Sequence, residues 1–200
     1  VCSSDLPADP EALKIFSALN DLGVISVRPI LLAVAQAGDS LEGMKHILRV
    51  VVRRIVVGNL GTGNVERRFS EAARTVSTHR RWETLVKDLD DLNPSREQFI
   101  EQLQKRSFNK GVLAFLRRSI LAKTITPDSS GVLHYIWTKQ VPNWHDMTEE
   151  DGAFWASTIG NTFLSDLDRR PKDAVDWIGF KRVMLPTAIN TEWQARLSEI

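Results

Sequence analysis

One histidine stands inside a stretch that otherwise has the character of a buried strand. His134 lies among apolar and aromatic residues in the run Val132–Trp137. A histidine side chain titrates near neutral pH, so it can remove a proton from an attacking water molecule. The alternative is a core histidine whose ring nitrogens are satisfied by hydrogen bonds, and the spacing alone favours this structural interpretation.

An asparagine further along the chain supplies a possible partner for this histidine. Asn161 belongs to the segment Ile159–Ser165, which is typical of a short strand after a turn. Its amide could hold an imidazole in one orientation. A histidine on one strand, an asparagine at the next and a helix behind them is the arrangement of a ββα-metal (HNH) nuclease site. There, a divalent cation neutralises the scissile phosphate and the leaving oxygen.

Basic residues gather in two segments of the chain and are candidates for binding DNA phosphates. They are Lys45, Arg49 and Arg53 in the first segment and Lys110, Arg117 and Arg118 in the second. The first three recur every four residues and therefore share one helix face. Such a face could follow a phosphate backbone. The alternative is a solvated face that pairs with the acidic stretch at 82–104.

Several other kinds of catalytic site lack their motifs in this sequence. The glycine-containing stretch at 58–64 fits neither a dinucleotide fingerprint nor a P-loop, and we expect a connection between helices there. There is no serine-nucleophile motif. Pro127-Asp128 suggests a restriction-type carboxylate site, but Trp137 occupies the position where that pattern needs a second acid. A single cysteine, Cys2, cannot assemble a cysteine zinc site.

Apolar residues recur every three or four positions over the first two-thirds of the chain, a pattern that predicts helices. The expected helices cover 10–20, 30–37, 40–57, 65–76, 82–89, a segment starting at 93–95, and 110–121. After Thr126–Gly131 the pattern changes to strands at 132–141 and 159–165 and helices starting near 148, 171 and 191. We therefore expect a mainly α protein, with a helical domain over 7–125 followed by a small α+β module over 126–200.

The composition is that of an ordinary globular protein. Of the 200 residues, 42% are hydrophobic and 26% are charged, and the net charge is +1, so total charge does not indicate a partner. No apolar run approaches the ~20 residues that a membrane span needs. The single cysteine excludes an internal disulfide and fits a reducing compartment, from which we expect a cytoplasmic protein that does not bind membranes.

Both ends of the sequence carry signs of interruption. Residues 1–6, VCSSDL, resemble the translation of a common sequencing adaptor, and we exclude them from the fold prediction. The final stretch, TEWQARLSEI, has helical character without a stop signal. We therefore expect a fragment that has lost an upstream domain and is truncated at its C-terminal end.

Several stretches together resemble the C-terminal part of GmrSD-type, modification-dependent restriction endonucleases. The stretch ILRVVVRRIVVGNLGTGNVERRFSEAARTV is similar to the helical middle domain of that family, and FNKGVLAFLRRSIL to the helix before its nuclease strand. VLHYIWTKQVP lies where the family has a Glu-His-Ile-Leu-Pro signature, and IGNTFL is similar to its Gly-Asn-Leu-Thr-Leu element. The closing TEWQARLSEI resembles the family's last helix, which contains a tryptophan.

The resemblance implies an HNH nuclease domain that cleaves double-stranded DNA, modified in some cases, within a phage-defence system. It implies His134 as general base and Asn161 as its orienting amide. The cofactor would be Mg²⁺ or Mn²⁺, and a nucleotide would bind only through an upstream ParB-like domain of the same protein. The metal ligands depart from the family: Leu133 replaces the expected Glu, Arg170 stands near the expected second Asn, and Asp168 is the nearest substitute. An eroded module that only binds DNA or contacts its upstream domain is therefore the alternative.

Overall fold

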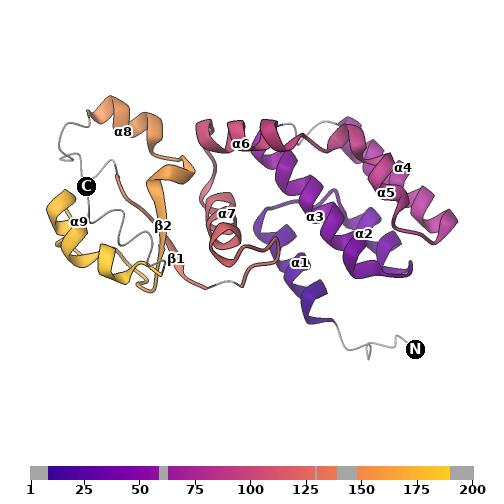
Figure 1. Cartoon of the computed structure of the whole chain (residues 1–200), viewed down its shortest axis with the longest axis horizontal. Coiled ribbons are helices and arrows are strands. Elements are labelled where there is room, and N and C mark those ends of the chain that lie inside the picture. Colours follow the sequence, from indigo (N-terminus) through magenta and orange to yellow (C-terminus); the bar gives the residue numbers. More distant parts are fainter. Residues whose placement is uncertain (1–8, 59–62, 129, 139–147, 190–200) are drawn as a thin grey trace. The chain divides into compact units, whose positions relative to one another are not determined.

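The computed structural model describes residues 9–58, 63–128, 130–138 and 148–189 (Figure 1). These residues are mainly helical, with a single two-stranded antiparallel sheet among them, which confirms the predicted fold class. The chain forms two compact units, Val1–Leu103 and Gln104–Ile200. The division falls before the helix at 110–122 rather than near residue 125, because that helix packs against the strands of the second unit.

The first unit is entirely helical within its described residues. Its elements are α1 (Pro10–Asp21), α2 (Arg28–Ala35), α3 (Ser40–Val57), α4 (Gly63–His79), α5 (Thr84–Asp88), the 3-10 turn η1 (Asp90–Leu92) and the start of α6 (Arg96–Lys105). Helix α2 packs against α3 and α4, and α1 packs against α3. The periodic apolar positions fill this interior, and Ile15, Ile47 and Phe69 are fully buried.

Side-chain caps mark the starts of α1 and α6 in the first unit, whereas α2, α3 and α5 begin without a side-chain cap hydrogen bond. The side chain of Asp9 accepts a hydrogen bond from the Glu11 N–H at the start of α1. Ser95 and Gln98 exchange hydrogen bonds of 3.2 and 3.0 Å at the start of α6, which is a capping box. At the start of α3, Asp39 holds the cap position with a φ of 50° and makes no side-chain cap hydrogen bond.

The second unit combines helices with the small sheet. After the end of α6 come α7 (Lys110–Ala122), β1 (Val132–Tyr135), α8 (Glu149–Trp155), the 3-10 turn η2 (Ile159–Asn161), β2 (Thr162–Ser165), α9 (Trp177–Val183) and the 3-10 turn η3 (Leu185–Thr187). The two strands pair with Leu133 opposite Leu164 and His134 opposite Phe163. Described strand structure is therefore shorter than the predicted 132–141 and 159–165.

Polar caps also set the helix starts in this unit. Asn109 accepts a hydrogen bond of 2.9 Å from the Val112 N–H, and Thr148 accepts one of 3.1 Å from the Asp151 N–H. The expected helix at 171–180 begins only at Trp177. Asp176 has extended backbone angles and accepts a 2.7 Å hydrogen bond from the Gly179 N–H, so it ends the loop and caps α9.

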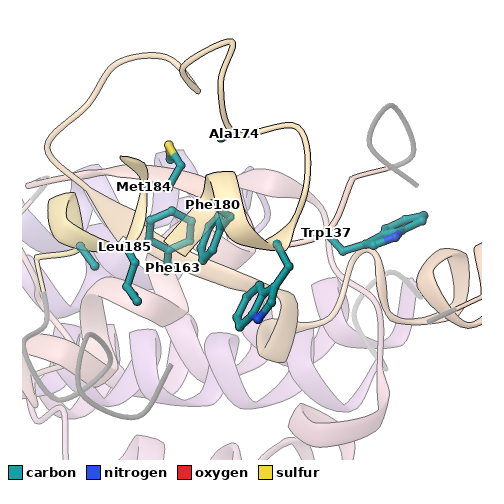
Figure 2. Close-up of a cluster of buried hydrophobic side chains, with 8 residues drawn as sticks. Trp137, Phe163, Ala174, Phe180, Met184 and Leu185 are labelled. Carbon is teal, nitrogen blue, oxygen red and sulfur yellow. The ribbon is translucent and has the colours of Figure 1, made fainter. Parts of the chain in front are cut away.

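A hydrophobic cluster fills the space between the sheet and α9. Phe163 of β2 meets Phe180 of α9 edge to face, with ring centroids 5.4 Å apart (Figure 2). Met184 and Leu185 extend the cluster, and Trp177 stacks on Phe180. Since side chains alternate along a strand, His134 lies on the same face of the sheet as its partner Phe163.

Within the described ranges, no helix combines the length and the apolar character that crossing a membrane requires. Residues 1–6, most of the expected strand beyond Thr138 and the expected helix at 191–199 lie outside the described residues.

Candidate functional site

His134 is held in one orientation by a backbone carbonyl. The imidazole is 9% exposed, and its Nε2 lies 2.7 Å from the carbonyl oxygen of Leu167 in the loop after β2. A carbonyl oxygen only accepts, so Nε2 carries a proton, and a ring with this single proton has Nδ1 as its acceptor. The ring also lies against Phe163, with centroids 5.7 Å apart. A hydrogen bond and a ring contact of this kind are typical of a structural histidine in a protein core. The same hydrogen bond selects the tautomer with the proton on Nε2, which a general base acting through Nδ1 would also require.

Asn161 uses its amide to join backbone segments. Its Oδ1 accepts a 2.7 Å hydrogen bond from the Trp137 N–H, and its Nδ2 donates to the carbonyls of Trp137 and Ala156 at 3.0 and 2.9 Å. Both amide hydrogens are therefore committed to carbonyls. Among the described residues no hydrogen bond joins Asn161 to His134. The asparagine ties the end of β1 to the segment before β2, and its expected role of orienting the imidazole does not follow from its hydrogen bonds.

A guanidinium group lies beside the end of the histidine strand. Arg170 Nη1 donates to the carbonyls of Tyr135 and Ile136 at 3.0 and 3.1 Å, and Nε donates to the carbonyl of Ala174 at 2.9 Å. The group also lies 5.8 Å from the centre of the Phe180 ring. Desolvation lowers the pKa of Arg170 from its ordinary value. These contacts place a fixed cation next to the two residues that follow His134.

The described residues around His134 do not fit a divalent cation. Leu133 is buried in the strand position before the histidine, where neighbouring side chains point to opposite faces. Asp168 is exposed, and Arg170 occupies carbonyls that could otherwise face a cation. No three His, Cys, Asp or Glu side chains gather closely enough for metal binding in the part of the chain that the structure describes.

Two of the three basic residues expected on α7 turn toward their own unit. Arg117 donates from Nε to Thr162 at 2.9 Å and from Nη2 to the Ile159 carbonyl, and burial lowers its pKa to about 10. Arg118 donates to the carbonyls of Ser130 and Gly131 at 3.1 and 2.9 Å. Both groups hold α7 to the strand segments, while Lys110 at the start of the helix is exposed.

The basic face of α3 is only partly available for a ligand. Lys45 forms an ion pair of 3.0 Å with Glu42, and Arg53 donates to Asn93 Oδ1 at 3.1 Å. Arg49, midway between them, is exposed and makes no hydrogen bond or ion pair with another described residue. Of the three α3 residues predicted to contact phosphates, Arg49 is therefore the one whose charge faces solvent without a competing partner among the described residues.

Comparisons with known proteins provide no identification. No family model matches the chain, no curated protein matches it, and no solved structure matches it.

Sequence reasoning missed two features of this region. The Leu167 carbonyl that bonds His134 is a backbone group, and every residue type has one. The residue type at position 167 therefore could not predict this hydrogen bond. Arg170 was recognised only as a departure from a metal-ligand pattern, and its three carbonyl partners depend on how the loop after β2 folds.

Proposed function

We propose that the chain is part of a GmrSD-like restriction protein and binds double-stranded DNA. In this proposal the second unit is an HNH-like module that does not carry out metal-dependent cleavage. The observation that carries it is the surroundings of His134: an apolar Leu133 stands before the histidine, and the Arg170 guanidinium bonds the carbonyls that follow it. At 4 Å, two like unit charges repel by about 4 kcal/mol at an effective dielectric of 20. A repulsion of that size corresponds to roughly a thousandfold loss in metal affinity.

The exposed charge on α3 supports the DNA-binding part of the proposal. Arg49 lies on the same helix face as Lys45 and Arg53, and a row of cations four residues apart is suited to phosphates along a groove. Glu42 pairs with Lys45 and Asn93 bonds Arg53, so these two cations should contribute less to phosphate binding. Arg49 should therefore account for most of the salt dependence of DNA affinity.

The test is the salt dependence of duplex binding by the Arg49→Gln variant, measured by fluorescence anisotropy over a range of salt concentrations. Loss of one phosphate contact should reduce the slope of log K against log salt by about 0.9. The matched control is Arg74→Gln, which removes an exposed arginine from α4. Equal slopes for wild type, Arg49→Gln and Arg74→Gln would overturn the phosphate contact, and absence of salt-dependent binding by wild type would overturn the DNA-binding proposal.

A second candidate function is cleavage itself, with His134 as general base. The observation that favours it is the hydrogen bond from Nε2 to Leu167, which leaves Nδ1 as the acceptor in the neutral ring. Asp168, one residue beyond Leu167 and exposed, is the candidate metal ligand in that case. Nicking of plasmid DNA separates the two candidates.

A further inference from the structure

The basic face of α3 contains a histidine that the proposed function has not yet used. His46 lies three residues before Arg49 and seven before Arg53, so the three side chains share one side of the helix. Its ring lies near the indole of Trp82, with centroids 6.3 Å apart. Its Nε2 is buried and has no hydrogen-bond partner among the described residues. No acceptor is therefore in place to hold a proton on this nitrogen.

Charged side chains lie on α3 itself and on the elements packed against it. They are Glu42, Lys45, Arg49, Arg53 and Arg54 on α3, Glu11, Lys14 and Asp21 on α1, Arg28 on α2, Arg81 and Glu83 beside Trp82 in sequence, and Lys87 and Asp88 on α5. Of these described groups, Arg49 and Arg53 are the two whose positive charges disfavour the protonated imidazole. Burial first, and then these two cations, lower the pKa of His46.

We infer that His46 couples proton uptake to phosphate binding on α3, so that duplex DNA bound at Arg49 draws a proton onto the imidazole. The inference rests on the proposed DNA binding. A phosphate at Arg49 reduces the positive field of Arg49 and Arg53 that disfavours the charged imidazole, and its own negative charge favours that form. The burial of His46 does not change on binding. The pKa of His46 can therefore rise only by the amount that the nearby positive charges had lowered it and that the phosphate charge adds.

The sign of the pH dependence follows from this coupling. The free protein keeps His46 neutral down to a pH below the ordinary value for histidine, because its pKa is lowered. The DNA complex has a higher pKa at the same group, so binding takes up a proton in the pH range between the two values. DNA affinity should therefore rise as pH falls through this range, by at most tenfold per pH unit for one proton.

The experiment measures duplex affinity by anisotropy at constant salt from about pH 7.5 to about pH 5.5, where histidines titrate. Wild type is compared with His46→Gln, which cannot take up the proton. The matched control is His79→Gln, which removes an exposed histidine from α4. We expect wild type and His79→Gln to bind about fivefold more tightly at the lower pH than at the higher one, and His46→Gln to lose most of this gain.

A second measurement keeps the test independent of the variant's folding. The pKa of His46 is followed by NMR in the wild-type protein with and without the duplex, and it should rise on binding. The same pH gain in His46→Gln as in wild type, or an unchanged His46 pKa in the complex, would overturn the inference while DNA binding stands. No binding at any pH would overturn both this inference and the proposed function.

Discussion

At the residue scale, polar side chains around the sheet mainly satisfy backbone groups. Asn161 makes three hydrogen bonds to Trp137 and Ala156, and Arg170 makes three to the carbonyls of Tyr135, Ile136 and Ala174. Both residues tie the end of β1 to segments that follow it far along the chain. Asn161, which the sequence suggested as a catalytic residue, therefore has a structural explanation that needs no substrate, and Arg170 contributes to the same region by bonding backbone carbonyls.

Replacing Asn161 with alanine tests that explanation. The substitution leaves the Trp137 N–H and two carbonyls without their partner in a buried place, at an expected cost of about 3 kcal/mol in the free energy of unfolding. Urea denaturation followed by circular dichroism measures the change. The control is Asp168→Ala, an exposed position where the expected change is within about 0.5 kcal/mol. Equal stabilities of the two variants would contradict the role of the Asn161 amide.

At the element scale, close packing of α8 against the end of β1 depends on a glycine. A Cβ atom added at Gly152 would overlap the indole ring of Trp137, which is 3% exposed. Gly160 in η2 is a suitable control for Gly152, because the nearest atom to a Cβ added at Gly160 is Thr158 Oγ1 at 3.8 Å.

Gly152→Ala should therefore lower the free energy of unfolding by about 2 kcal/mol through overpacking. Gly160→Ala should leave it nearly unchanged, since its Cβ meets only an ordinary contact distance. Thermal unfolding measured by circular dichroism compares the two variants. A Gly152→Ala protein as stable as Gly160→Ala would show that α8 does not pack on Trp137 in this way.

The helices could be predicted from sequence more completely than the site. The apolar repeat in Ser40–Val57 defines one buried face, so the helix follows from its pattern. The later start of α9 could not be predicted from that pattern, because it depends on the hydrogen bond between Asp176 and Gly179. In the site, the residue types suggested His134 and Asn161, whereas the Leu167 carbonyl and the inward turn of Arg117 arise only when distant segments meet.

At the scale of the whole molecule, the two units have different proposed tasks. The first unit carries the basic face of α3, where Arg49 is exposed and His46 is neutral over a wider pH range than an ordinary histidine. The second unit carries His134 within a small sheet covered by a hydrophobic cluster. With a net charge of only +1, DNA binding has to come from the local distribution of cations and not from the overall charge.

Plasmid nicking tests most directly the proposal that the second unit does not cleave DNA with a metal. The assay uses purified protein and Mg²⁺ or Mn²⁺ under conditions in which duplex binding is detected. The wild-type chain is compared with His134→Ala. We expect neither protein to convert supercoiled plasmid to the nicked form faster than buffer alone, because Leu133 provides no ligand and Arg170 repels a divalent cation at the histidine strand. Nicking by wild type that disappears in His134→Ala would contradict the proposal and assign His134 to catalysis.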